Sequence, residues 1–162
     1  MQGVILDHDS LGPKDLDFTR LQNLPINWTF YKDCPAEQVS KRIADAQIVL
    51  TNKAPLDRHV IAGASNLKFI SVLATGINHI DLEAACQHNI VVSNAVAYGT
   101  ASVVQHVWAM ILALTTNLEP YHRAAVSGAW QQSNFFCFMD YPVRELTGKV
   151  LGIVGAGELG QA

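Results

Sequence analysis

Short apolar runs alternate with amphipathic segments over roughly the first hundred residues. The apolar runs predict buried strands, and apolar residues at helical spacing between them predict short helices. The expected strands are 3–6, 28–31, 48–50, 67–73 and 90–93, and the expected helices are 35–46, 57–62 and 81–88. Strands that alternate with helices indicate a parallel α/β sheet, and strands this apolar suit a sheet covered on both faces. We therefore expect one flavodoxin-like α/β domain over residues 1–97.

Three residues mark where the predicted helices begin. Pro35 suits the first helical position, where its missing N–H costs no hydrogen bond. Asp57 and Asp81 stand at the N-cap positions of the next two helices, where a carboxylate accepts a free backbone N–H.

The pattern changes after residue 98. From Thr100 to about Leu118 the chain is apolar nearly all round a helix, which predicts a helix buried between domains or between subunits. Thr100 or Ser102 can cap its start. A second helix over 119–130, an irregular aromatic stretch over 131–141 and a buried strand over 149–154 complete the prediction.

Composition narrows the class of protein. Of the 162 residues 49% are hydrophobic and 15% charged, which favours a globular fold. The net charge of −3 gives no reason to expect nucleic acid or an anionic membrane as a partner, and no apolar run reaches the roughly 18 residues of a membrane helix. The three cysteines, Cys34, Cys86 and Cys137, are widely spaced, so we expect free thiols and a cytoplasmic protein.

A glycine pattern follows the predicted strand 149–154 directly. Its residues are Gly155, Ala156, Gly157, Glu158, Leu159 and Gly160. After a buried strand, the first glycine suits a tight turn, the second the approach of a pyrophosphate, and the third close helix packing. The alternative is a glycine-rich turn that binds nothing. The strand before the turn favours dinucleotide binding.

Two loops are expected at the carboxyl ends of predicted strands, the edge where open α/β sheets bind ligands. In the loop 73–81, Gly76 lets the backbone approach a small ligand, and successive N–H groups can hold a carboxylate. An ordinary loop with a glycine turn is an equally good interpretation. Lys53, after the strand 48–50, can attract an anion, although most single loop lysines are only solvated.

No other residue pattern predicts catalytic or metal chemistry. The six histidines lack metal-pair spacing, and no cysteine or carboxylate cluster joins them. No Gly-x-Ser-x-Gly segment is present, so a hydrolase has no support. We assign no catalytic residue and no metal ligand.

Taken in order, five stretches resemble the D-isomer-specific 2-hydroxyacid dehydrogenases, especially the glycerate dehydrogenase (hydroxypyruvate reductase) branch. The stretches are 51–56, 73–82, 98–106, 128–130 and 145–157. The resemblance implies hydride transfer between NAD or NADP, with NAD favoured, and a 2-oxo or 2-hydroxy acid such as hydroxypyruvate or D-glycerate. It implies a substrate-binding domain over 1–97. It also implies interdomain and dimerisation helices, and the start of a Rossmann NAD-binding domain, over 98–162, with a homodimer formed through the 100–118 region.

The resemblance also implies roles for individual residues. Thr75, Gly76 and Ile77 offer backbone N–H groups to the substrate carboxylate, and Lys53 lies at the cleft. Thr100 contacts the cofactor. The turn that begins at Gly155 and continues through Ala156, Gly157, Glu158, Leu159 and Gly160 binds its pyrophosphate.

The chain departs from the family pattern in two ways. Gly99 stands where family members often carry asparagine. The family's catalytic arginine, acidic residue and histidine have no counterpart in these residues, and neither His79 nor His106 matches the catalytic position. We therefore expect the N-terminal part of such an enzyme, inactive by itself. The alternative is a non-enzymatic α/β domain that binds a carboxylate or pairs with another subunit.

Overall fold

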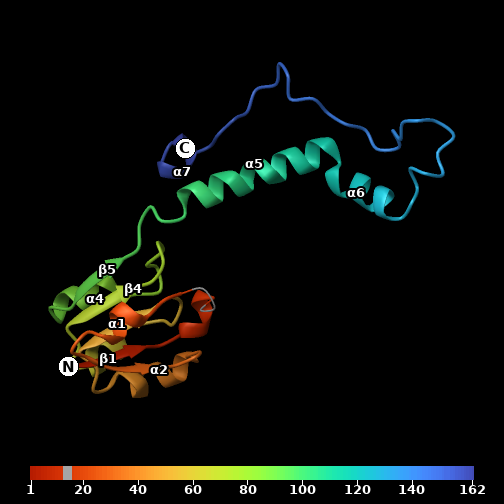
Figure 1. Ribbon diagram of the computed structural model, residues 1–162. Helices are drawn as coiled ribbons and strands as arrows, with labels where there is room; N and C mark the ends of the chain where they lie inside the picture. The colour runs from red at the N-terminus through yellow and green to blue at the C-terminus, as the bar shows by residue number, and fades with distance from the viewer. Residues whose placement is uncertain (13–15) are drawn as a thin grey trace. The chain divides into compact units, whose positions relative to one another are not determined.

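The computed structural model describes residues 1–12 and 16–162. The chain divides into two compact units, Met1–Val96 and Ala97–Ala162, and each is described by itself (Figure 1). The first unit carries the sheet, and the second carries a long helix followed by a largely irregular segment.

The first unit is built on a five-stranded sheet with the order β2-β1-β3-β4-β5. All its strand pairs are parallel. This is the flavodoxin-like strand order, so the predicted fold class is confirmed. The strands are β1 (Gln2–Ile5), β2 (Asn27–Phe30), β3 (Ile48–Thr51), β4 (Phe69–Val72) and β5 (Val91–Asn94).

The strands are in register at their starts. Trp28 pairs with Gly3, Gly3 with Ile48, Ile48 with Phe69, and Phe69 with Val91. Strands of four residues that begin within one residue of each other also end within one residue of each other. The loops that leave β1, β3 and β4 therefore start at the same edge of the sheet.

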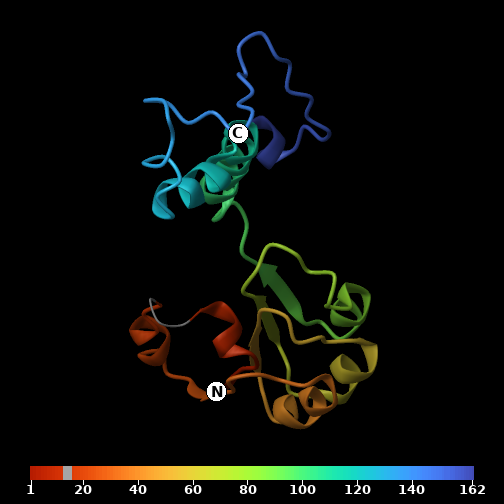
Figure 2. The same ribbon diagram turned by 90° about the vertical axis from the view of Figure 1, so that its right-hand side faces the viewer.

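Three helices pack along one face of the sheet, as Figure 2 shows: α2 (Ala36–Ile43), α3 (Arg58–Gly63) and α4 (Leu82–Gln87). Both predicted aspartate caps are confirmed. Asp57 accepts the N–H of Val60 at 2.9 Å, and Asp81 accepts that of Ala84 at 2.8 Å. Pro35 was expected at the first helical position but is the N-cap, because its ψ of 142° is extended. Two single-turn elements without apolar periodicity were not predicted, η1 (His8–Leu11) and α1 (Thr19–Gln22).

The core lies between those helices and the sheet. Val39, Ile43 and Ile61 from the helices pack in one cluster with Ile70 and Val72 of β4, and each has at most 1% of its surface exposed. On the opposite face of β4, the side chains remain half-exposed. The expectation of a sheet covered on both faces is therefore met at β4 only on the side of the three helices.

The second unit contains α5 (Thr100–Thr116), α6 (Leu118–Val126) and a single turn, α7 (Glu158–Gln161). Gly99 is the N-cap of α5 and no side chain caps it, so the expected cap by Thr100 or Ser102 is wrong. Asn117 adopts a left-handed conformation that ends α5, and α6 leaves at an angle of 66°. Helix α6 stops at Val126, short of the expected Trp130. Among the described residues, no single helix meets both the length and the hydropathy needed to cross a membrane.

Helix α5 has the predicted extent, but it is not buried within the described part of the chain. None of its residues is buried, and Trp108 and Leu114 have 47% and 73% of their surface exposed. Burial between domains or between subunits therefore stays a prediction, since the described part of this chain does not cover the apolar surface of α5.

The predicted strand over 149–154 is not formed. Val150 and Val154 are essentially fully exposed, at 96% and 105% of the reference surface. A strand is held by hydrogen bonds to a neighbouring strand, and no described segment pairs with these residues. Residues 149–154 are instead irregular and lead into the glycine turn. The short helix α7 begins at Glu158, within this turn, with Gly157 as its N-cap.

Replacing Ile70 with alanine is expected to lower the free energy of unfolding of this chain by about 2–5 kcal/mol, because the side chain is fully buried in the central part of the sheet. Val91 on β5 is 63% exposed, so Val91→Ala is the matched control and should cost under about 1 kcal/mol. Urea unfolding followed by circular dichroism measures both. Equal losses would contradict this placement of the core.

Candidate functional site

The candidate site in the first unit is formed by two loops at the carboxyl edge of the sheet. We call residues 51–56 the β3 loop and residues 73–81 the β4 loop. Leu56 and Ile80 form an isolated parallel bridge between them. In this bridge the N–H of Leu56 donates to the carbonyl of His79, and the N–H of Asp81 donates to the carbonyl of Leu56, each at 2.9 Å. The loops that carry Lys53 and Gly76 are therefore fastened side by side.

Hydrogen bonds from the neighbouring strands' ends hold the β4 loop through Leu73 and through the side chain and carbonyl of Thr75. The N–H of Leu73 donates to the carbonyl of Thr51 at 2.8 Å. The Thr75 hydroxyl donates to the carbonyl of Ala95 at 2.9 Å, and the Asn94 amide donates to the carbonyl of Thr75 at 2.8 Å. These contacts fix the loop against the ends of β3 and β5.

The centre of the β4 loop keeps free donors. The backbone N–H groups of Thr75, Gly76 and Ile77 donate no hydrogen bond to any described residue. A Cβ added to Gly76 would meet only Asn78 Oδ1, at an ordinary 3.4 Å, and the glycine has no positive φ. The turn itself does not require glycine there, and the space beside the Gly76 backbone is open.

The β3 loop is fastened by Asp7, which follows β1 closely and was not singled out from the sequence. The side chain of Asp7 accepts the backbone N–H of Asn52 at 2.8 Å and of Ala54 at 2.9 Å, and it also accepts the N–H of Lys53. Only 6% of the surface of Asp7 is exposed. A charged residue directly after a buried apolar strand was the signal in the sequence, because such a residue needs partners to be buried.

Lys53 is the exposed residue in this turn. Thr51, Asn52 and Ala54 around it are buried. Asn52 is held further by its side-chain amide, which donates to the Ser10 hydroxyl at 2.9 Å. The Lys53 side chain therefore leaves a fixed backbone at the carboxyl edge of the sheet.

His79 of the β4 loop does not match the family's catalytic position, and the structure shows its surroundings. Its Nε2 atom is buried and has no hydrogen-bond partner among the described residues. Burial lowers the pKa of the His79 ring, the nearby Lys53 ammonium lowers this pKa further, and the Asp7 carboxylate acts in the opposite direction. Burial and Lys53 of the β3 loop thus both favour the neutral form of the His79 ring.

The glycine turn in the second unit has the features that a pyrophosphate loop needs. Gly155 has a φ of +105°, which favours glycine. A Cβ on Gly157 would meet nothing within 4 Å, so the backbone there is open. A Cβ on Gly160 would lie 2.0 Å from the carbonyl oxygen of Gly155, so close packing excludes any other residue. The Thr100 hydroxyl donates to the carboxylate of Glu158, which joins the start of α5 to this turn.

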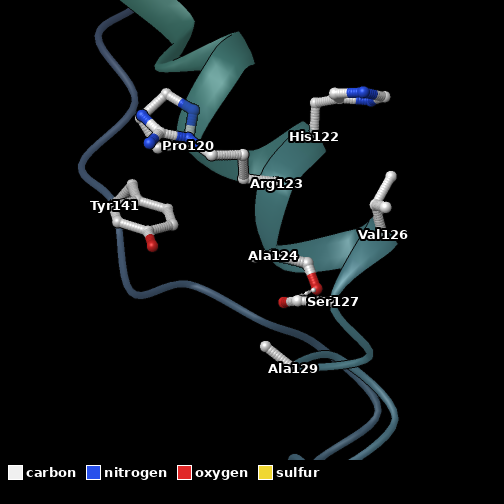
Figure 3. A pocket seen from close by; sticks show the side chains of 8 residues that line it. All are labelled: Pro120, His122, Arg123, Ala124, Val126, Ser127, Ala129 and Tyr141. Carbon is white, nitrogen blue, oxygen red and sulfur yellow. Dashed lines mark hydrogen bonds between the residues drawn. The ribbon is translucent and has the colours of Figure 1, made fainter.

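A separate hollow of about 730 Å³ lies beside α6 and is shown in Figure 3. In that view His122 and Val126 project from the side of α6 opposite to Tyr141. Arg123 at this hollow is paired with Glu119. None of the residues that the sequence indicated for binding lines the hollow, so we do not assign it to the candidate site.

Comparison with known proteins gives one family. Residues 4–147 match the model of the D-isomer specific 2-hydroxyacid dehydrogenase catalytic domain. A hydroxypyruvate reductase from Blautia hydrogenotrophica is 40% identical over 100% of this chain and 51% of its own length. A glycerate dehydrogenase from Methylorubrum extorquens is 33% identical over 98% of this chain and 50% of its own length. The chain thus spans about half the length of these curated relatives.

Solved structures share the fold. A protein from Thermus thermophilus matches with a TM-score of 0.82 and 23% identity, over 99% of this chain and 50% of the other. The D-lactate dehydrogenase from Aquifex aeolicus, solved with NAD and lactic acid, matches with a TM-score of 0.75 and 23% identity, over 98% of this chain and 46% of the other.

We expect the His79 ring to titrate with a pKa below its ordinary value, because burial and the Lys53 ammonium both disfavour its charged form. Lys53→Met should raise this pKa. Lys68 is exposed at the opposite, amino end of β4, so Lys68→Met should leave it unchanged. Proton NMR of the ring as a function of pH measures all three. An unchanged pKa in Lys53→Met would contradict the proximity of the two groups.

Because the pKa of His79 is lower in the folded chain, its contribution to the free energy of unfolding depends on pH. Since the unfolded chain binds the proton more tightly, the contribution of His79 is fully present above about pH 6.5, the ordinary value, and decreases as the pH falls through the lower pKa of the folded chain.

Proposed function

This chain belongs to the D-isomer specific 2-hydroxyacid dehydrogenase family, and we propose that it forms the substrate-binding part of an oxidoreductase together with its first cofactor-binding turn. The proposed reaction is hydride transfer between a nicotinamide cofactor and a 2-oxo or 2-hydroxy acid. Hydroxypyruvate and D-glycerate are the proposed pair, which the names of the two relatives support. In this assignment residues 1–97 form the substrate-binding domain, and 98–162 belong to the connecting helices and the nucleotide side.

One observation carries the substrate assignment. Thr75, Gly76 and Ile77 present three successive N–H groups without a described partner, in a loop fastened to the one that carries Lys53. Successive free N–H groups form a concave site for an anion, and an ammonium group adds charge to the attraction. We propose that the three N–H groups and Lys53 hold the substrate carboxylate and so orient the reacting carbon.

His79 is not proposed as the acid or base of the reaction, although it is the histidine of this loop. Its Nε2 atom is buried, whereas Thr75 and Gly76 of the same loop are exposed. Its proposed role is to pack, as a neutral ring, between the two loops. A proton donor or acceptor for the substrate oxygen has to come from elsewhere in the enzyme.

The nucleotide side is proposed to bind through the turn from Gly155 to Gly160 and through Thr100. Open backbone at Gly157 and close packing at Gly160 fit the approach of a pyrophosphate to a glycine turn. A nicotinamide dinucleotide, when bound, supplies or accepts the hydride. NAD is proposed in preference to NADP.

We further propose a homodimer formed through the α5 region. Apolar side chains line α5, and the exposed ones include Val107, Trp108, Met110, Leu112 and Leu114. An exposed apolar surface of this kind on a globular protein indicates a partner surface.

The three cysteines are free, which supports the proposal of a reducing, cytoplasmic environment.

The carboxylate site predicts how the chain binds D-glycerate. Lys53→Met should weaken binding about tenfold, because it removes a charge-assisted contact. Gly76→Ala should weaken it similarly without unfolding the chain, because the added methyl group fits the loop but fills open space beside the proposed donors. NMR titration, followed at the amide of Gly76, measures both. The matched control Lys68→Met, at the other end of β4, should bind as the unmodified chain does. If Lys68→Met lost as much affinity as Lys53→Met, the loss would come from the net charge of the chain and not from a contact of Lys53 with the ligand.

The 162-residue chain alone is expected to have no reductase activity with hydroxypyruvate or glyoxylate and NADH. The reason is the resemblance: the family's catalytic arginine, acidic residue and histidine have no counterpart among these residues. The measurement is the absorbance of NADH in a sample of confirmed mass. Turnover above background would mean that the assignment of the catalytic residues is wrong.

A further inference from the structure

The buried Asp7 carboxylate accepts three hydrogen bonds from the backbone of a single turn. Its Oδ1 accepts the N–H of Asn52, and its Oδ2 accepts those of Lys53 and Ala54. Three successive N–H groups thus converge on one carboxylate that is 94% buried, given its 6% exposure. This is an anion nest of the backbone whose anion belongs to the chain itself.

The contact lies where the order of the strands reverses. Strand β1 pairs with β2 on one side and with β3 on the other, so β1 and β3 flank the topological switch point of the sheet. Open α/β sheets bind ligands outside the carboxyl ends of the strands at this point. Asp7 follows β1 in the sequence, and the turn 52–54 follows β3. The hydrogen bonds of the Asp7 carboxylate therefore connect the two chain segments on either side of the switch point.

The hydrogen bonds from 52–54 to Asp7 fix the backbone of one exposed residue, Lys53. Thr51 and Asn52 are buried with Ala54, and further bonds hold the turn: the Thr51 hydroxyl donates to the carbonyl of Ala54 at 3.1 Å. Lys53 alone in this turn is exposed. A lysine side chain is long and flexible, so the position of its ammonium group depends first on how well its backbone is held.

We propose that Asp7 is a positioning residue for the carboxylate site: by binding the N–H groups of 52–54, it places Lys53 so that its ammonium group reaches an anion held by the N–H groups of 75–77. This inference rests on the proposed function, because it takes Lys53 as a contact of the substrate carboxylate. Asp7 itself touches no substrate and acts only through Lys53.

A double-mutant cycle separates this role from a purely structural one. D-glycerate is titrated into four forms of the full 162-residue chain: unmodified, Asp7→Asn, Lys53→Met, and the double variant. Asparagine keeps the shape but replaces one acceptor oxygen by a donor facing N–H groups. Asp7→Asn should weaken binding about tenfold when Lys53 is present and less than about twofold when it is replaced, since coupled residues are not additive. Equal weakening in both backgrounds would overturn the positioning role.

A matched control tests the effect of stability. Asp57 accepts one backbone N–H at the start of α3 in the same unit, and Asp57→Ala removes that cap without touching the turn 52–54. Its affinity for D-glycerate should equal that of the unmodified chain. A loss as large as in Asp7→Asn would show that any weakening of the unit lowers binding, and the proposal would fail.

Hydrogen exchange on the unmodified chain keeps the proposal testable even if Asp7→Asn does not fold. The amide protons of Asn52, Lys53 and Ala54 should exchange much more slowly than those of Thr75, Gly76 and Ile77, which have no described acceptor. Equally fast exchange in both sets would show that the carboxylate does not hold the turn in solution, and would overturn the proposal.

The outcomes distinguish the two proposals. If D-glycerate does not move the Gly76 resonance, or if Lys53→Met binds it unchanged, the carboxylate site is wrong and the role of Asp7 falls with it. If binding depends on Lys53 but the effect of Asp7→Asn persists without Lys53, the carboxylate site stands and only the positioning role is wrong.

Discussion

Parallel pairing in a common register is the constraint on which the rest of the first unit depends. Because the five strands are parallel and begin within one residue of each other, every loop that follows a strand starts at the same edge. Asp7, Lys53 and Gly76, which are far apart in the sequence, therefore share one edge of one sheet. Antiparallel pairing at any of these strands would send one of the three to the opposite edge.

The same edge contains two groups of backbone N–H donors, one with an acceptor and one without a described acceptor. The N–H groups of 52–54 are occupied by the Asp7 carboxylate, whereas those of 75–77 have no described acceptor. The Asp7 carboxylate holds the loop 51–56 in place, while the N–H groups of 75–77 are the ones proposed to bind the substrate carboxylate. The bridge between Leu56 and Ile80 joins these two loops, so the loop held by Asp7 supports the one whose donors have no described acceptor.

Much of the first unit could be predicted because its signals are local. Apolar runs located all five strands, and the caps at Asp57 and Asp81 follow from a preference that acts within one turn of helix. The role of Asp7 could not be predicted in this way. Its three partners lie 45 to 47 residues further along the chain, and nothing in the residues around Asp7 reveals which turn will meet it.

The second unit shows where local signals mislead. The apolar residues of α5 and of 149–154 predict burial, and the helix forms because its hydrogen bonds are internal to it, although nothing described buries it. The segment 149–154 is equally apolar, yet its backbone donors and acceptors can be satisfied only by a neighbouring strand. A helix is thus predictable from its own residues, while a strand depends on a partner. The glycine turn behaves more like the helix: the left-handed Gly155 and the close approach at Gly160 are contacts within six residues, so the turn keeps its geometry even where the strand before it is not formed.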